Sequence, residues 1–330
     1  MTVGLTTRTI TASPAAVAEA ALCLKDGGLV AFPTETVYGL GADAGNAAAI
    51  ARLYQAKGRP SFNPLIAHVG DLNAARQIAR FDARALRLAE TFWPGPLTLV
   101  LPRAEGCKVA DLATAGLDTV AIRVPAHPVA RQLLQAFGGA VVAPSANLSG
   151  HVSPTTAAHV HSDLDGRIDL ILDGGAVDVG VESTIVGCFE LPMLLRPGGV
   201  PREAIEAVLG GALVQPPADP ATGSTQPLAP GMLASHYAPR TPVYLGSRAI
   251  GHGDALLAFG PDRIPGVDVA RAVMNLSESG DLAEAAANLF GHLRALDHVG
   301  ARAIQVMPVP HHGLGEAIND RLRRAAVPRT

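Results

Sequence analysis

Aromatic residues, charged residues and cysteines are all scarce in this 330-residue chain. Aromatics make up only 4%, too few for a protein that binds single strands by stacking bases on rings. Charged residues make up 17%, which excludes a solvated disordered chain. The cysteines, Cys23, Cys107 and Cys188, are far apart and odd in number. They argue for a reducing compartment and against disulfides or a thiolate metal site.

The chain also lacks a charge surplus and a long apolar run. It has 26 basic and 29 acidic residues, whereas a general nucleic-acid binder usually carries a basic excess. No segment reaches the roughly 18 apolar residues of a membrane span, and the N-terminus lacks the apolar core of a signal peptide. There is no Walker-A sequence, which excludes a P-loop NTPase. We expect a soluble, cytoplasmic protein with no membrane association and no strong direct nucleic-acid binding.

Hydrophobic residues make up 48% of the chain, enough for two buried cores. Short apolar runs alternate with helical patterns over residues 1–208, including a helix at 46–57 capped by Asn46, which predicts an α/β domain around a sizeable sheet. Seven prolines then lie between Val214 and Pro242, as in a stiff linker. The alternation of short apolar runs with helical patterns resumes after these prolines. We predict a catalytic domain at 1–210, a proline-rich linker at 211–240 and a smaller Rossmann-like α/β domain at 241–330.

Two segments have the composition of ligand-binding loops. Residues 32–45, FPTETVYGLGADAG, are expected to form a loop whose N–H groups and hydroxyls face a small ligand, or else a tight strand-to-helix turn. Their glycine spacing does not match a dinucleotide fingerprint. Lys57 and Arg59 lie two apart in a Gly/Pro turn, so both are expected on a cleft surface facing a polyphosphate. An ordinary basic turn is the alternative.

Other polar residues stand at strand ends. Arg123 interrupts an apolar strand and therefore needs a carboxylate partner, supplied either by the protein or by a ligand. Ser145 and nearby hydroxyls follow another strand and suit phosphate or ribose contacts, but no GxSxG elbow makes Ser145 a nucleophile. His236 and Tyr237 are larger than a spacer requires, which favours a linker that lies over a site. The histidine pairs at 159/161 and 311/312 lack partners at metal-binding spacing, so no metal site is predicted.

Seven motifs, in this order, resemble the YrdC-type family of threonylcarbamoyl-AMP synthases: FPTETVYGLGA, KGRPSFNPLI, WPGPLTLVLP, TVAIRVPAH, APSANLSG, ESTIV and RPG. The linker APGMLASHYAP and the segments NLFGHLRALD and GLGEAINDRLRRAA resemble the long, two-domain form of that family. One departure is Leu233-Ala234-Ser235, where many relatives carry basic or aromatic residues. The resemblance covers nearly the whole chain. It implies an open twisted YrdC-type sheet with helices, followed by the smaller domain.

The resemblance also implies a reaction. L-Threonine, bicarbonate or carbon dioxide, and ATP would give threonylcarbamoyl-adenylate and pyrophosphate, the first step of threonylcarbamoyladenosine modification beside the tRNA anticodon. Mg²⁺ would accompany ATP without dedicated protein ligands. Proteins of the tRNA threonylcarbamoyl-transferase machinery would use the product. Two other classes stay open: an RNA-binding module, and a carbamoyl-transfer domain detached from a larger maturation enzyme.

Position by position, the resemblance implies roles for residues of this sequence. Catalytic roles fall to Lys57 and Arg59. ATP binding is implied for Arg59, Asn63, Thr119, Ser145, Asn147, Ser153, Arg196 and Tyr237. L-Threonine binding is implied for Thr36, His68, Arg123, Ala143 and Ser183. Arg123 is expected to face the carboxylate of threonine, and His236 and Tyr237 are expected to form part of a lid that excludes water.

Overall fold

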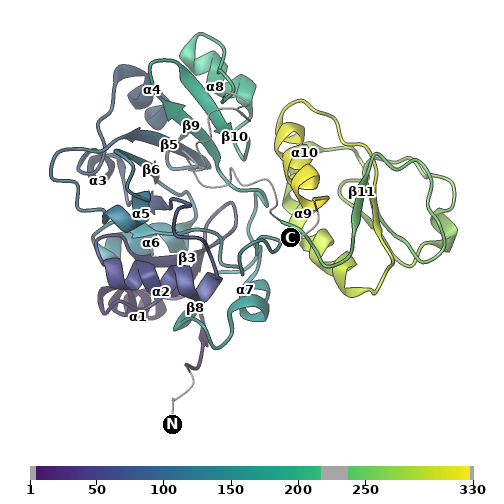
Figure 1. Cartoon of the computed structure of the whole chain (residues 1–330), viewed down its shortest axis with the longest axis horizontal. Coiled ribbons are helices and arrows are strands. Elements are labelled where there is room, and N and C mark those ends of the chain that lie inside the picture. The colour runs from purple at the N-terminus through teal and green to yellow at the C-terminus, as the bar shows by residue number, and fades with distance from the viewer. Residues whose placement is uncertain (1–4, 217–236, 328–330) are drawn as a thin grey trace.

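A computed structural model describes residues 5–216 and 237–327 of the chain. Two α/β domains follow one another (Figure 1). Within the described residues of the first domain, ten strands form one mixed sheet in the order β1-β8-β2-β3-β7-β4-β6-β5-β9-β10. The strands are β1 Arg8–Thr11, β2 Val30–Pro33, β3 Tyr38–Asp43, β4 Ile66–His68, β5 Leu97–Pro102, β6 Thr119–Arg123, β7 Val141–Val142, β8 Leu170–Asp173, β9 Thr184–Cys188 and β10 Pro192–Arg196. The expected α/β architecture with a large sheet is confirmed.

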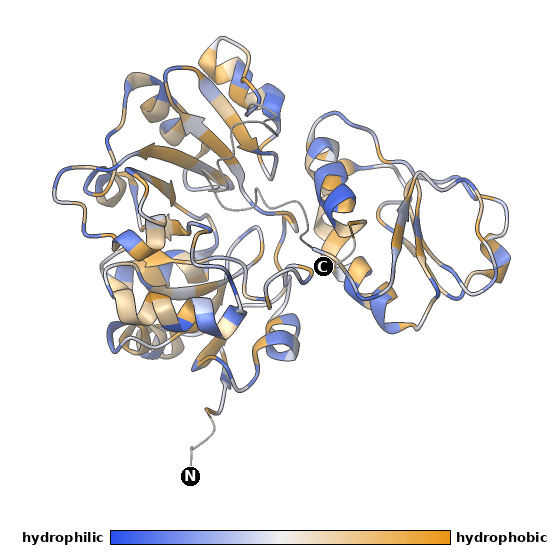
Figure 2. Cartoon of the chain, in the orientation of Figure 1, coloured by the Kyte–Doolittle hydropathy of each residue, from blue (hydrophilic) through white to orange (hydrophobic). Residues whose placement is uncertain are grey.

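Helices pack on both sides of this sheet. They are α1 Pro14–Lys25, α2 Ala47–Lys57, α3 Leu72–Arg76, α4 Ala83–Phe92, α5 Asp111–Thr114, α6 Pro128–Phe137, α7 Ala157–Leu164 and α8 Arg202–Leu209. The expected helix over 46–57 is confirmed: the side chain of Asn46 accepts from the N–H groups of Ala48 and Ala49, and Gly58 ends α2 in the left-handed region. Figure 2 shows that the strands are largely apolar, whereas the helices carry both polar and apolar residues.

The expected loop over 32–45 is wrong in its second half. Residues 38–43 form β3, which pairs antiparallel with β2 on one side and with β7 on the other. A Cβ on Gly41 would lie 2.9 Å from the ring of Phe32 and 3.0 Å from Val141, so this glycine permits close strand packing. The hairpin turn at 34–37 is closed by Thr34, whose hydroxyl donates to the carbonyl of Val37 over 2.7 Å.

Strand register brings the polar strand ends together. β4 and β6 run parallel, and His68 lies opposite Arg123. Ser145, just after β7, bridges to Gly39 of β3. Beyond β5, β9 and β10 form an antiparallel pair, in which Arg196 lies opposite Ile185. Residues far apart in the sequence therefore meet at one edge of the sheet.

The smaller domain has four parallel strands in the order β11-β14-β12-β13 in the part that the structure describes. Its elements are β11 Val243–Leu245, β12 Ala255–Ala258, the 3₁₀ helix η1 Val267–Val269, β13 Val273–Asn275, α9 Leu282–His298, β14 Ile304–Val306 and α10 Leu314–Ala325. This confirms the expected Rossmann-like domain. Both α9 and α10 lie between its sheet and the first domain (Figure 1). In the described ranges, no helix combines the length and apolarity of a bilayer-crossing segment.

The two domains share a hydrophobic cluster. Val152 and Val181 of the first domain belong to the same buried cluster as Leu289 and Leu293 of α9. Gly180, with a φ of +75°, allows a close approach between the domains: a Cβ there would lie 2.3 Å from the carbonyl oxygen of Ala286. Ion pairs add polar contacts across the interface. They join Arg202 to Glu316 and Arg294 to Asp163.

Candidate active site

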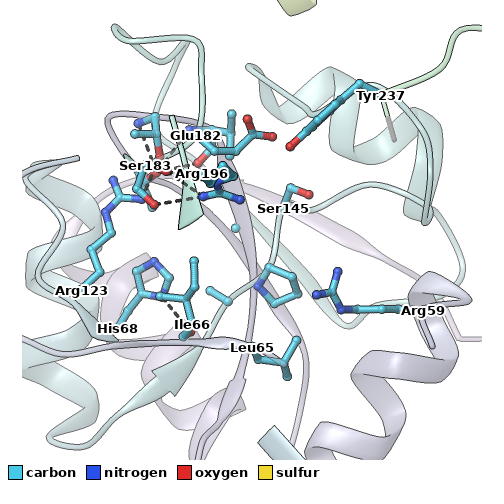
Figure 3. Close-up of a pocket in the computed structure, with 16 residues that line it drawn as sticks. Arg59, Leu65, Ile66, His68, Arg123, Ser145, Glu182, Ser183, Arg196 and Tyr237 are labelled. Carbon is cyan, nitrogen blue, oxygen red and sulfur yellow. Dashed lines mark hydrogen bonds between the residues drawn. The ribbon is translucent and has the colours of Figure 1, made fainter. Parts of the chain in front are cut away.

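A pocket opens where these strand ends meet, and part of its wall comes from the segment that leads into the second domain. Nine of the residues predicted from sequence line it: Thr36, Arg59, His68, Arg123, Ala143, Ser145, Ser183, Arg196 and Tyr237. Figure 3 shows two sides. His68 and Arg123 lie on one, Arg59 on the other, and Arg196 between them.

Two guanidinium groups, that of Arg59 on one side of the pocket and that of Arg196 near its centre, supply positive charge. Arg59 donates to the backbone carbonyl oxygens of Asn63 and Pro64, at 3.4 and 3.0 Å. Arg196 donates to the carbonyl oxygen and hydroxyl of Ser183, at 2.9 to 3.2 Å. Burial is the main cause that lowers the pKa of each to about 10; repulsion from Arg196 contributes for Arg59, and repulsion from Arg321 contributes for Arg196. Both therefore remain charged near neutral pH, a combination suited to a polyphosphate.

On the other side, Arg123 already has a protein carboxylate. Its Nη2 lies 2.6 Å from Oε1 of Glu35, and it also donates to Thr36 Oγ1 over 3.0 Å and to the carbonyl of Gly95 over 3.1 Å. Burial alone would raise the pKa of Glu35, but the charge and hydrogen bonds of Arg123 lower it. The predicted carboxylate partner of Arg123 is therefore supplied by the protein, by Glu35. That its guanidinium also faces the carboxylate of threonine stays a prediction.

His68 is a neutral group beside this ion pair. Burial, followed by repulsion from Arg123, lowers the pKa of its imidazole to about 3. Its Nδ1 lies 3.1 Å from the carbonyl oxygen of Ile66, which can only accept, so Nδ1 carries a proton. The ring can therefore orient a polar ligand without adding charge.

Comparisons with known proteins agree along the whole chain. Residues 23–198 match the Sua5, YciO and YrdC family described as "telomere recombination", and residues 200–327 match the C-terminal domain of threonylcarbamoyl-AMP synthase. A threonylcarbamoyl-AMP synthase from Bacillus subtilis is 43% identical over 326 residues, which cover 94% of this chain and 92% of the relative. One from Pyrococcus abyssi is 42% identical and covers 92% of each. This chain belongs to the threonylcarbamoyl-AMP synthase family.

Solved structures of the family agree with the fold described above. The crystal structure of P. abyssi Sua5 complexed with L-threonine superposes with a TM-score of 0.86 at 38% identity, and the match covers 98% of this chain and 97% of that one. The chain is therefore a nucleotidyl-transferring enzyme of tRNA modification. The suspected resemblance to this family is confirmed.

One expectation about the basic turn of this synthase is wrong. Lys57 does not lie on the cleft surface: it is the last residue of α2, is 2% exposed and is absent from the pocket wall. Its ammonium donates to the backbone carbonyl oxygens of Ser145, over 2.6 Å, and Asn147. Burial lowers its pKa well below the usual range. Lys57 therefore fixes the chain that carries Ser145.

Four other predicted residues are not among those that line the pocket. Asn63, Asn147 and Ser153 are buried, and Thr119 begins β6 opposite Pro102. Asn147 donates to the carbonyls of residues 148 and 151 over 2.8 Å. Among the described residues, its Oδ1 and that of Asn63 have no hydrogen-bond partner. His236 and the departure at Leu233-Ala234-Ser235 lie outside the described residues.

Tyr237 connects the pocket to the second domain. It lines the pocket and is 1% exposed. Its φ of +66° is a left-handed backbone conformation that residues other than glycine rarely adopt. Its ring stacks on Phe290 of α9 with centroids 5.4 Å apart. Burial, with the nearby charge of Glu182, raises the pKa of its hydroxyl. The tyrosine is therefore held in place by the C-terminal domain.

Sequence reasoning missed Glu182 as a pocket residue. Its side chain is 6% exposed and lines the pocket (Figure 3). Burial alone would raise its pKa, but Arg321 and Arg196 lower it to about 2, so it is a carboxylate. The available signal was a charged residue two positions before the buried strand β9. No cluster of three or more metal-ligating side chains occurs in the described ranges.

Proposed function

We propose that this enzyme makes L-threonylcarbamoyl-adenylate from L-threonine, bicarbonate or carbon dioxide, and ATP, and releases pyrophosphate. The observation that carries the proposal is that Arg59 and the central Arg196 share one pocket with the neutral His68 and the compensated Arg123, which lie on the side opposite Arg59. The first pair suits phosphates and the second suits an amino acid. A relative solved with L-threonine supports the second assignment.

The chemistry needs no protein nucleophile. The amine of threonine and bicarbonate give a carbamate and water, and a carbamate oxygen then attacks the α-phosphorus of ATP. A new P–O bond forms as the bond to pyrophosphate breaks. Arg59 and Arg196 would stabilise the charge that develops on the phosphate oxygens, while Ser145 and Ser183 would orient them. Lys57 would act by holding the Ser145 turn.

Mg²⁺ is proposed to enter with ATP. Glu182 is the carboxylate that lines the described pocket wall, and its oxygens are engaged by Ser153 and Arg321. This donor set fits a cation held mainly by phosphate oxygens and water. When bound, the ion would neutralise phosphate charge. The product would pass to the tRNA threonylcarbamoyl-transferase machinery, in the cytoplasm.

Pyrophosphate release by the purified protein tests the proposal. ATP and Mg²⁺ are supplied, and threonine and bicarbonate are added singly and together. We expect release only when both are present. Release with neither would indicate a nucleotide hydrolase, and salt-dependent RNA binding without any release would favour the RNA-binding alternative.

A further inference from the structure

Arg321 of α10 reaches from the second domain into the first and is completely buried. Its Nε lies 2.9 Å from Oε2 of Glu182, and its Nη1 donates to the carbonyl oxygen of Pro197 over 2.8 Å. Nη1 also bonds Asp320, its own neighbour. The guanidinium therefore joins the helix to the segment just before β9 and to the residue after β10.

Glu182 makes this contact important for the pocket. A buried carboxylate repels phosphate. In this pocket the carboxylate of Glu182 also lies close enough to Arg196 to attract its guanidinium. One of its oxygens accepts from the hydroxyl of Ser153 over 2.6 Å, and the other accepts from Arg321. With Glu182 satisfied in this way, the guanidinium of Arg196 bonds Ser183 and not the carboxylate.

Arg321 also contacts the tyrosine that lines the pocket. Its guanidinium carbon lies 5.5 Å from the ring centroid of Tyr237, within the range of a cation–π contact. It holds the turn after Arg196 as well, where a Cβ on Gly198 would lie 2.3 Å from the carbonyl oxygen of Glu182. One side chain thus touches three parts of the pocket: its carboxylate, its tyrosine and the turn after its second arginine.

We propose that Arg321 is a positioning residue through which the C-terminal domain sets the charge of the nucleotide pocket: it neutralises Glu182 and so leaves Arg196 for the phosphates of the ligand. The identity of that ligand as ATP rests on the proposed function. Without Arg321, the buried carboxylate would lose its charge partner, and Arg196 is the cation on the same pocket wall that would replace it.

A double-mutant cycle tests this role in the full-length chain. The variants are Arg321→Gln, Glu182→Gln and the pair together, and the readouts are the Kd for ATP by calorimetry and the KM and kcat for pyrophosphate release. We expect Arg321→Gln to raise the Kd and KM for ATP about tenfold or more. The double variant should recover an affinity close to that of Glu182→Gln, because no carboxylate remains to capture Arg196.

Arg202→Gln is the matched control, since Arg202 also pairs across the domain interface, with Glu316, but does not line the pocket. It should leave the Kd for ATP unchanged. Equal losses in Arg202→Gln and Arg321→Gln, or no recovery in the double variant, would show a merely structural role and overturn the proposal. If Arg321→Gln does not fold, Arg321→Met in the Glu182→Gln background replaces it, and an ATP affinity far below that of Glu182→Gln alone would contradict the proposal. Because ATP binding is measured directly, a wild type that binds ATP without threonine-dependent turnover would contradict the proposed reaction and not this role.

Discussion

The arginines of the pocket differ in whether a protein carboxylate pairs with their charge. Arg123 forms a 2.6 Å ion pair with Glu35, so its charge is compensated within the protein. The hydrogen bonds of Arg59 and Arg196 go to carbonyl and hydroxyl oxygens, so their charges remain available. An uncompensated charge attracts a polyanion, whereas a compensated one can hydrogen-bond a zwitterion without attracting phosphate. Charge compensation therefore distinguishes the two sides of one pocket, as the proposed phosphate and amino-acid subsites require.

The largest expected effect follows removal of an uncompensated arginine. Arg59→Ala should reduce threonine-dependent pyrophosphate release about 100-fold or more, because a charge facing the phosphates is lost. Its thermal midpoint should change little, since the lost bonds are to carbonyl oxygens of its own turn. Arg263→Ala, at an exposed ion pair, is the control and should retain full activity. Full activity in Arg59→Ala would contradict the phosphate assignment.

Removal of the compensating carboxylate should act on stability. Glu35→Gln leaves Arg123 buried without its charge partner and should lower the free energy of unfolding by about 3–5 kcal/mol. Urea denaturation measures this, and Glu19→Gln, which breaks the exposed pair with Arg8, should cost less than about 1 kcal/mol. Similar small losses in both variants would show that the Arg123–Glu35 pair is not needed to hold the guanidinium.

The smallest effect concerns the neutral histidine. With the pKa of His68 near 3, its NMR signal, assigned with His68→Gln, should not shift between pH 5 and 8. The unfolded chain takes up this proton near pH 6.5 and the folded chain does not, so His68 makes stability fall as pH drops below about 6.5. His68→Gln should weaken that fall. A titration midpoint between pH 5 and 8 would contradict the neutral assignment.

The sequence predicted much of the site because charged and hydroxyl residues follow apolar strands. Ser145 could be placed at a strand end from local pattern, and the family resemblance implied Arg196 and Ser183; all three line the pocket. The partners of these residues could not be predicted. Glu35 is 88 residues from Arg123, and Arg321 is 139 residues from Glu182, so only the folded sheet and the docked helix bring them together.

Local composition also led to wrong predictions at two places in the chain. A lysine in a Gly/Pro turn is usually solvated, yet the carbonyls of a distant strand end enclose Lys57. Glycines in residues 38–43 suggested a loop, yet at Gly41 the missing side chain makes room for Phe32 from the paired strand. In both cases the deciding contact comes from another element of the sheet.

The hydrophobic cluster shared by the two domains has a consequence for synthesis of the chain. Val181 is completely buried, and Leu289 and Phe290, which belong to its cluster, come more than 100 residues later in the sequence. During translation the first domain therefore emerges with an apolar surface that nothing later in the chain can yet cover. Only when α9 leaves the ribosome is that surface covered, and from then on the two domains should unfold together as one cooperative unit.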